Sequence, residues 1–268
     1  MNRIVSIALI GAGNLATSLA HGLVEAGFCL RQVVARSEVS AQRLAHQLGV
    51  PYAVGLHSLT PEADVYIIAV PDGQIADVLA QIPPLKALML HTSGSTPLSV
   101  FNAERFPRHG VLYPLQTFSR QRVVSLRNVP FCIEASMAQA TDQTLELAHA
   151  LSSRVICMTS EQRVWLHLMG VLGCNFVNHL LAIAHHIGQR QGIELDVLRP
   201  LIDETIRKAF DSPSPAAAQT GPAIRGDMAT IGRHINMLGS IDEHWAELYN
   251  ALSNSIIKTN QRYNPNNP

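Results

Sequence analysis

A glycine pattern near the N-terminus constrains the fold of this chain more than any other feature. The stretch "IALIGAGNLATSLAHGL" contains Gly11, Gly13 and Ala16 in a GxGxxA arrangement. It follows an apolar run that is typical of a buried strand and opens a segment, 14–26, with apolar residues at helical spacing. In that context the first glycine permits a tight turn, the second lets a pyrophosphate approach the backbone, and the alanine keeps the helix against the sheet. The pattern predicts a dinucleotide site.

The start of the predicted helix supplies the phosphate-binding groups. The N–H groups of its first residues, Asn14 and Leu15, have no partner within the helix and would face the phosphates. The alternative is a glycine turn that only packs. The strand before the turn and the helix after it favour the dinucleotide site over that alternative.

Strand and helix patterns alternate through the first part of the chain. Apolar runs predict strands at 30–35, 63–70 and 86–91, with shorter ones near 109–112, 129–134 and 154–158. After residue 160 the strand pattern stops, and helices are expected at 161–190, 194–210 and 240–260. Alternation at this spacing indicates a parallel sheet covered by helices. We therefore predict an α/β fold, with a Rossmann-type domain over 1–158 and an all-helical domain over 159–268.

The residues after the second predicted strand indicate which dinucleotide binds. An acidic residue there would bind the ribose 2′-hydroxyl of NAD, whereas this chain has Arg36 and Ser37. An arginine can pair with the 2′-phosphate of NADP through a charge-assisted fork, so these residues favour NADP(H). An exposed loop arginine without a ligand is the alternative. Val70 and Pro71 follow the next buried strand and would lie under the cofactor, and Asp72 is expected to cap the following helix.

Bulk composition narrows the class of protein. The chain has 268 residues, of which 47% are hydrophobic and 15% charged, and this excludes the disordered classes. Its formal net charge of zero argues against nucleic acid or an anionic membrane as a partner. Polar residues interrupt the long apolar runs, so no spanning helix is expected. With no signal-peptide pattern and four cysteines far apart, we expect a cytoplasmic protein with buried free thiols.

Two polar motifs follow strands where a substrate could bind. "HTSGS" carries His91 and Ser93, and "YPLQTF" carries Tyr113 and Gln116. A strand end with polar side chains and a glycine can form the wall of a polar substrate site. The alternatives are a histidine satisfied by backbone groups, and a tyrosine and a glutamine that only hold their loop.

The long helix carries His167, Asn175 and Asn178 among apolar residues. His167 and Asn178 are eleven residues apart and are expected to share a face, where they could line a cleft between the domains. None of the three lysines lies in these motifs, so His91 or His167 is the better proton donor. Satisfied core side chains are the alternative, and the histidine spacings do not favour a metal site.

A third motif, "AQTGPAIRGD", lies in the helical half. Thr220 and Gly221 form part of a turn, and Arg225 could hold a carboxylate or phosphate of the substrate. A loop brace between Arg225 and Asp227 is the alternative.

These motifs resemble those of known families. "GAGNLA" with the following "HGL" resembles pyrroline-5-carboxylate reductase and the deazaflavin-dependent NADP oxidoreductases. "HTSGS", "YPLQTF", His167 with Asn175–Phe176, and "TGPAIRGD" resemble the motifs of Rossmann-like NADP oxidoreductases that carry a helical C-terminal domain of unknown function. This resemblance extends over nearly the whole chain. It implies NADP(H) as the cofactor, but it names no substrate.

The helical half is similar to the dimerising domain of 6-phosphogluconate and β-hydroxyacid dehydrogenases, which implies a homodimer through this domain. Those enzymes use a lysine on the first long helix, and this chain has His167 in that region. In pyrroline-5-carboxylate reductase a glycine- and threonine-rich loop holds the substrate carboxylate, which implies a similar role for Thr220 and Gly221.

These observations favour an NADP(H)-dependent oxidoreductase that acts on a small polar substrate in the cleft between the domains, with His91, His167 and Asn175 as the catalytic candidates. Two other functions stay open. One is a protein that senses NADP or binds another ligand without hydride chemistry, since fold does not determine function. The other is a deazaflavin-dependent NADP reductase.

Overall fold

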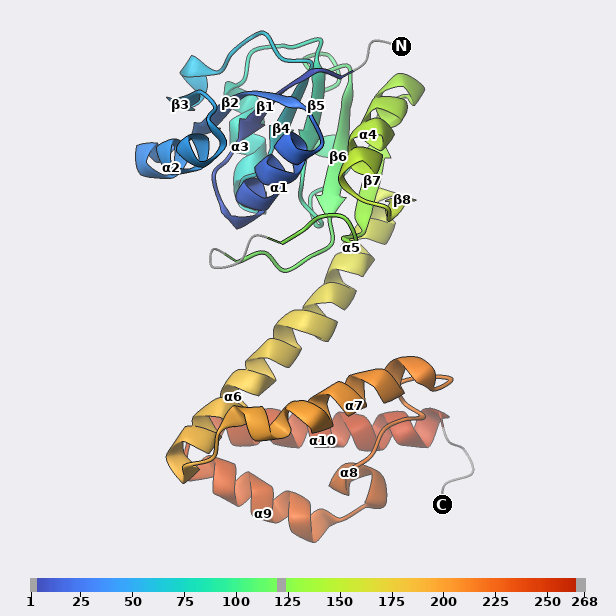
Figure 1. Cartoon of the computed structure of the whole chain (residues 1–268). Helices are drawn as coiled ribbons and strands as arrows, with labels where there is room; N and C mark the ends of the chain where they lie inside the picture. The colour runs from blue at the N-terminus through green and yellow to red at the C-terminus, as the bar shows by residue number, and fades with distance from the viewer. Residues whose placement is uncertain (1–3, 120–123, 264–268) are drawn as a thin grey trace. The chain divides into compact units, whose positions relative to one another are not determined.

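The computed structural model describes residues 4–119 and 124–263, and the chain forms two compact units (Figure 1). The first unit ends at Asn175 and the second begins at Phe176. The sequence analysis placed this division at residues 158 and 159. The difference is the helix α5 (Ser160–Gly170), whose side chains contact strands of the first unit, as described below.

An eight-stranded sheet forms the centre of the first unit. Its strands are β1 (Ser6–Ile10), β2 (Cys29–Ala35), β3 (Tyr52–Val54), β4 (Val65–Ile68), β5 (Leu88–His91), β6 (His109–Pro114), β7 (Phe131–Ala135) and β8 (Val155–Cys157). They lie in the order β3-β2-β1-β4-β5-β6-β7-β8, and all neighbours pair in parallel except β6 with β7. This order reverses direction between β1 and β4, and open α/β sheets bind ligands at such a point. The predicted α/β class is confirmed.

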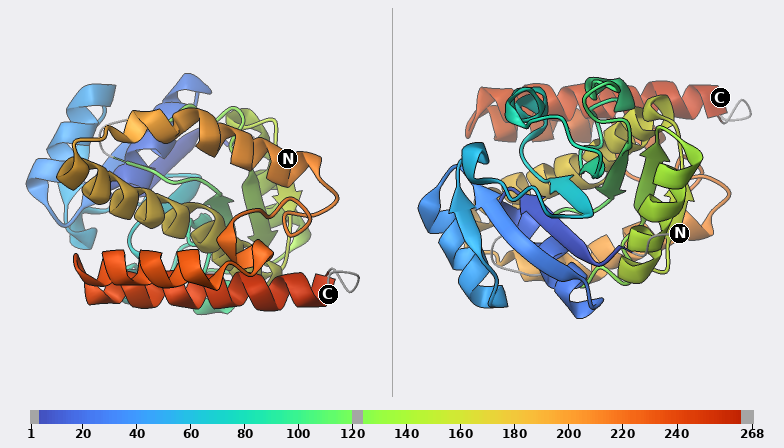
Figure 2. Two further views of the ribbon diagram at one scale, coloured as in Figure 1. Left: turned by 90° about the horizontal axis from the view of Figure 1, so that it is seen from below. Right: turned by 90° about the horizontal axis from the view of Figure 1, so that it is seen from above.

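Helices cover both faces of this sheet (Figure 2). α1 (Asn14–Glu25), α2 (Glu38–Leu48) and α4 (Ala138–Leu151) pack on one face, and α3 (Ile75–Gln81) packs with the segment 98–106 on the other. Side chains alternate along each central strand: Ile7 and Leu9 belong to the first cluster, and Ala8 and Ile10 to the second. Because both faces are buried, the central strands are continuous apolar runs, which is why the sequence revealed them.

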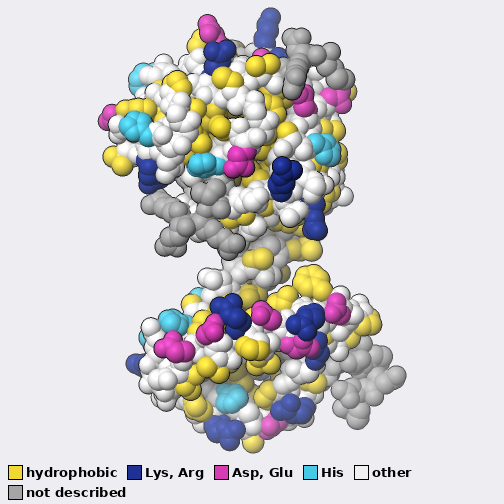
Figure 3. Space-filling view, viewed as in Figure 1, with side chains coloured by type: hydrophobic (Ala, Val, Ile, Leu, Met, Phe, Trp, Pro, Cys, Tyr) yellow, Lys and Arg dark blue, Asp and Glu magenta, His cyan; other side chains and the backbone are white. Residues whose placement is uncertain are grey.

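In the second unit, the regular elements of the described residues 176–263 are all helices. They are α6 (Phe176–Gln191), α7 (Arg199–Asp211), α8 (Pro222–Arg225), α9 (Met228–Gly239) and α10 (Glu243–Tyr263). A hydrogen bond of 2.8 Å between His234 Nδ1 and the Tyr249 hydroxyl joins α9 to α10. Many large apolar side chains of this unit are exposed, as the yellow surface in Figure 3 shows.

Two expectations about surfaces need correction. All four cysteines are free, as expected, but only Cys132 is buried. The helical stretch Ser160–Gln191 has a mean hydropathy of 1.5 over an 18-residue window, so length and composition alone would let it cross a membrane. The sequence analysis had excluded such a helix. Arg163, near the start of this stretch, is fully buried in an ion pair, whereas none of the apolar 18-residue window is buried.

Candidate functional site

The turn between β1 and α1 brings three strand ends together. Gly11 has a φ of 123°, and its N–H donates to the Val34 carbonyl of β2 at 2.7 Å. A Cβ added at Gly11 would lie 2.2 Å from the Ala69 carbonyl oxygen, just beyond β4. Both the conformation and the close approach therefore require glycine here, as the dinucleotide pattern predicts.

Open space lies above this turn at Gly13. A Cβ added there would meet no atom of residues 4–119 and 124–263 within 4 Å, and Gly13 is exposed. α1 begins directly after it, and no side chain of the described residues caps its first N–H groups, which belong to Asn14, Leu15 and Ala16. Such a helix start can bind a phosphate. Asn14 Nδ2 also donates to the Phe118 carbonyl at 3.2 Å and so joins the turn to the loop after β6.

Arg36 and Ser37 lie at the end of β2. The Ser37 hydroxyl accepts a hydrogen bond from the Ser40 N–H at 3.4 Å and caps α2. Arg36 is exposed and has no ion pair among the described residues. A guanidinium beside a helix N-terminus is a suitable arrangement for a phosphate.

The residues after β4 differ in part from the prediction. Val70 is half-buried and Pro71 is exposed. Asp72 makes no capping hydrogen bond with the short helix that it begins. Its Oδ2 instead accepts a hydrogen bond of 2.5 Å from the Ser95 hydroxyl. The carboxylate therefore faces the loop after β5, a contact that the sequence analysis missed.

The "HTSGS" loop after β5 is held mainly by its own side chains. Ser93 Oγ accepts hydrogen bonds from the N–H groups of Ser95 and Thr96 at 3.1 and 2.9 Å. His91 is fully buried, its Nδ1 accepts from the Ser93 N–H at 3.2 Å, and its ring stacks on Phe101 at 5.5 Å. Burial, with a smaller contribution from Arg163, lowers the pKa of His91 to about 4. At neutral pH His91 is therefore an uncharged ring within the core.

Tyr113 and His167 meet beside this loop. The Tyr113 hydroxyl lies 3.1 Å from His167 Nδ1, although the two residues are 54 positions apart. A Cβ added at Gly94 would lie 2.6 Å from Tyr113 Cζ and 2.8 Å from His167 Nδ1. Burial raises the pKa of Tyr113 to about 12, so its hydroxyl stays protonated at neutral pH. We call these two residues the Tyr113–His167 pair.

Local sequence explains where α5, which carries His167, begins. The Thr159 hydroxyl accepts from the Gln162 N–H at 3.3 Å, and Gln162 Oε1 accepts from the Thr159 N–H at 2.9 Å. This reciprocal arrangement is a capping box, which satisfies two N–H groups at the helix start. The helix thus begins at Ser160 and places His167 two turns further along.

An ion pair beneath this helix was not predicted. Arg163 Nη1 lies 2.6 Å from Glu134 Oε2 of β7, and the Arg163 side chain has no exposed surface. Burial alone would raise the pKa of Glu134, but hydrogen bonds from Ser160 and Arg163 outweigh it and lower that pKa. The only sequence signal was an arginine four residues before His167, on the same helix face.

The other predicted site residues do not join this cluster through any contact among the described residues. The Gln116 side chain accepts from the N–H of Thr117 at 2.8 Å and holds its own loop. Asn175 and Asn178 are exposed. The segment Val171–Asn175 is a π-helix, and its wider turn admits one extra residue. His167 and Asn178 therefore diverge by roughly 100° rather than sharing a face.

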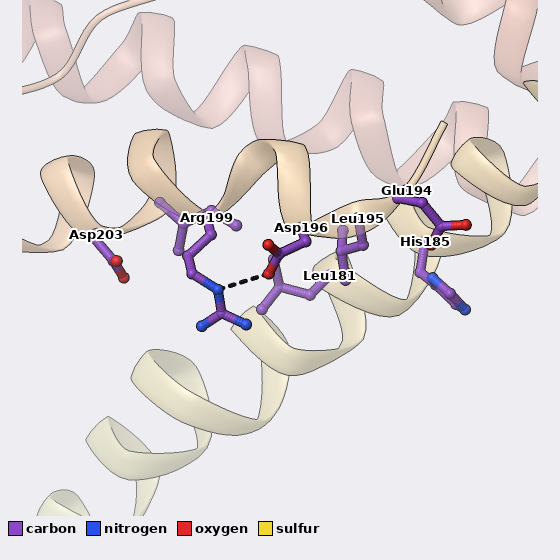
Figure 4. A pocket seen from close by; sticks show the side chains of 8 residues that line it. Leu181, His185, Glu194, Leu195, Asp196, Arg199 and Asp203 are labelled. Atoms are coloured by element: carbon purple, nitrogen blue, oxygen red, sulfur yellow. Dashed lines mark hydrogen bonds and ion pairs between the residues drawn. The ribbon is translucent and has the colours of Figure 1, made fainter. Parts of the chain in front are cut away.

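Thr220, Gly221 and Arg225 belong to the second unit. Gly221 has a φ of 111° and precedes α8, and Arg225 is exposed. Asp227 caps α9 by accepting from the Thr230 N–H at 3.0 Å and forms no ion pair with Arg225 among the described residues. A hollow of about 370 Å³ in this unit, with Asp196 bonded to Arg199 at its side, contains none of the predicted site residues (Figure 4).

Comparison with known proteins identifies the family. Residues 6–90 match the model of "NADP oxidoreductase coenzyme F420-dependent", and residues 129–256 match a domain of unknown function, DUF2520. A crystal structure of a "putative NADP oxidoreductase" from Bacteroides fragilis is 42% identical, with a TM-score of 0.87, over 95% of this chain and 98% of that one. The chain belongs to this NADP oxidoreductase family. No curated protein matches it.

More distant structures share the fold of the family. 1-Pyrroline-5-carboxylate reductase from Streptococcus pyogenes is 15% identical with a TM-score of 0.65, over 96% of this chain and 100% of that one. An imine reductase from Myxococcus stipitatus, in complex with NADP⁺, is 13% identical with a TM-score of 0.66, over 96% and 95% of the two chains. At this identity the likeness shows the fold alone. The predicted resemblance to an NADP oxidoreductase family is confirmed.

Proposed function

We propose that the chain is an NADP(H)-dependent oxidoreductase whose substrate binds beside Gly94, at the carboxyl edge of β5 and β6. The observation that carries this proposal is the Tyr113–His167 pair, which lies against Gly94 while Asp72 contacts the next residue, Ser95. An enzyme that transfers a hydride needs a side chain that exchanges a proton with the substrate. That side chain must lie near the edge of the sheet where the cofactor binds. The pair supplies such a group.

The residues suited to hold the cofactor are those of the β1–α1 turn and the end of β2. Gly13 leaves room for a pyrophosphate and the start of α1 offers N–H groups. Arg36 offers a cation for the 2′-phosphate, which is the support for NADP(H) over NAD(H). Bound NADPH would supply a hydride at this edge of the sheet.

His167 is the better of the two proton donors that the sequence left open. His91 is buried and uncharged at neutral pH, its Nδ1 accepts from the loop backbone, and its Nε2 is buried with no hydrogen-bond partner among the described residues. His167 is only partly buried. As an imidazolium, His167 donates its Nδ1–H to the oxygen of the protonated Tyr113 hydroxyl and carries its second ring proton on Nε2. Transfer of the Nε2 proton to the substrate atom that gains negative charge leaves a neutral imidazole beside Tyr113.

The substrate site extends along the "HTSGS" loop. The Ser95 hydroxyl and the Asp72 carboxylate are exposed there and can bind polar groups of a small substrate. We also propose that Thr220, Gly221 and Arg225, within the second unit, bind a carboxylate or phosphate. Their support is chemical, since an arginine beside a glycine turn suits a carboxylate.

NADPH oxidation over a panel of aldehydes, ketones and cyclic imines tests this function. His167→Gln should lower kcat by about 10²–10⁴-fold, as expected for loss of an acid catalyst, and Tyr113→Phe by less. His149→Gln, at an exposed position on α4, is the matched control and should keep full activity. Equal activity in all three variants would refute the donor assignment. Binding of NADPH without oxidation by any substrate of the panel would favour a sensor instead.

A further inference from the structure

Arg163 is a charged side chain that is fully buried. Its side chain has no exposed surface, and it is the largest fully buried side chain among the described residues. Removing a guanidinium from water costs several kcal/mol, which a paired carboxylate offsets only in part. A well-packed apolar side chain would stabilise this position at least as well. The contacts of Arg163 therefore call for a role besides stability.

Those contacts join three parts of the site. Arg163 Nη1 binds Glu134 of β7 at 2.6 Å, and Nη2 binds the Thr96 carbonyl of the "HTSGS" loop at 2.5 Å. The Ser160 hydroxyl donates to the same Glu134 oxygen at 2.6 Å and accepts from the Leu98 N–H at 2.9 Å. One side chain thus fixes the start of α5, the loop after β5 and the strand β7 relative to each other.

His167 follows Arg163 by four residues on α5, so the two side chains share a face of the helix. Both side chains lie against the loop after β5. Arg163 binds the Thr96 carbonyl of this loop, and His167 contacts Tyr113 beside Gly94 of the same loop. Any rotation or shift of α5 that separates Arg163 from Thr96 would also move His167 away from Tyr113.

We propose that Arg163, held by Glu134, is a positioning residue that sets the contact between His167 and Tyr113. This inference rests on the proposed function, in which that pair acts on the substrate. Arg163 touches neither substrate nor cofactor in this account. It acts through the placement of α5 against the loop.

The charge of Arg163 has a second effect on the same loop. After burial, it is the largest cause of the low pKa of His91, against the weaker opposite effects of Asp72, the Pro97 backbone and Glu134. A cation beside a buried imidazole disfavours the protonated ring. The His91 pKa therefore reports whether the guanidinium is in place.

Nitrogen NMR of the histidine rings in the full-length protein tests the proposal without a substrate. In Arg163→Gln, the Nδ1 signal of His167 should lose the shift caused by the Tyr113 hydroxyl, and the His91 pKa should rise from about 4. Arg163→Lys keeps the positive charge but loses the two guanidinium nitrogens that bind Glu134 and Thr96. The His91 pKa should therefore change less than in Arg163→Gln, while the contact between His167 and Tyr113 should still be lost. Arg154→Gln, at an exposed position before β8, is the control and should leave both signals unchanged.

The outcomes distinguish a positioning role of Arg163 from a role in stability alone. If Arg163→Gln lowers the melting temperature but leaves both ring signals as in the wild type, the positioning role is wrong. If that variant does not fold, Arg163→Lys gives the same test at His167, because a lysine keeps the charge but does not bind Glu134 and the Thr96 carbonyl together with the geometry of the guanidinium. NADPH affinity should be unchanged in every variant. If the wild type does not bind NADPH, the proposed function is wrong. Unchanged ring signals in Arg163→Gln would instead refute only the positioning role of Arg163.

Discussion

Gly94 is the residue on which the proposed site depends most directly. A Cβ at this position would lie 2.6 Å from Tyr113 Cζ, 2.8 Å from His167 Nδ1 and 2.9 Å from the Tyr113 hydroxyl. Both rings would have to move, and overpacking of this kind costs about 1–3 kcal/mol. Gly94→Ala should therefore lower stability in urea and lower kcat by about 100-fold, because the donor is misplaced.

The control for this variant is Gly232→Ala in α9, where an added Cβ meets nothing within 4 Å. Its stability should be unchanged or slightly higher, since alanine favours a helix. Wild-type activity in Gly94→Ala would show that contact between Tyr113 and His167 is not needed.

His91 should make stability depend on pH. Its pKa is about 4 in the folded chain and near 6.5 when unfolded, so the unfolded state binds more protons between these values. The free energy of unfolding should then fall by up to about 3 kcal/mol as the pH falls through this window. His91→Asn keeps an acceptor for the Ser93 N–H and should flatten this part of the curve. An identical slope in His91→Asn, with His149→Asn as the exposed control, would contradict the burial of a neutral ring.

The structure brings Tyr113 and His167, two of the residues that the sequence indicated for the site, into contact, and their roles stay predictions. His91 and Tyr113 were expected near a substrate because polar residues follow buried strands, and His167 because it interrupts an apolar helix. Which histidine is buried depends on Phe101 and on the packing around it, and no local pattern reveals that. The pairing of Arg163 with Glu134 joins residues 29 positions apart, which short-range periodicity cannot detect.

The turn between β1 and α1 is the element that joins fold and cofactor site, and its two glycines should respond differently. Gly11→Ala places a Cβ 2.2 Å from the Ala69 oxygen at a φ of 123°, so it should destabilise the first unit by about 3 kcal/mol. Gly13→Ala has open space and a φ of −79°, which alanine adopts freely. It should keep the wild-type melting temperature and lose about tenfold or more in NADPH affinity, since the methyl occupies the space for the pyrophosphate.

Thermal unfolding and fluorescence titration with NADPH measure the two effects separately. Equal NADPH affinity in Gly13→Ala and the wild type would mean that the turn is only a packing feature. The sequence left that alternative open, because a glycine turn by itself is compatible with a dinucleotide site and with packing alone.

The strands that the sequence predicted well are those buried on both faces, because they form continuous apolar runs. β1, β4 and β5 are buried on both faces and were visible as apolar runs. β3, with three residues at the edge of the sheet, and α9 of the second unit were missed. The π segment Val171–Asn175 has no marker in the sequence, so the predicted common face of His167 and Asn178 was wrong.

At the scale of the whole molecule, exposed apolar surface on the second unit needs a partner. Val197 and Leu201 are one turn apart and both exposed, and Phe210 on α7 is 86% exposed. We propose that a second copy of the chain covers this surface in a homodimer. Light scattering at micromolar concentration should then give twice the mass of one chain.

Leu201→Asp should shift the chain toward the monomer, because it places a charge in the apolar surface. Val39→Asp makes the same change at an exposed position of α2 in the first unit and should leave the mass unchanged. A monomeric wild type would refute the homodimer, and equal masses for the two variants would place the interface elsewhere.

Calorimetry with NADPH and NADH tests whether the chain binds NADP(H) through Arg36. The wild type should bind NADPH more tightly than NADH. Arg36→Ala should lose about 1.5–3 kcal/mol of NADPH affinity, the range for a hydrogen bond to a charged group, while NADH affinity stays the same. Equal affinity for both cofactors, unchanged by Arg36→Ala, would contradict the assignment of Arg36 and of NADP(H).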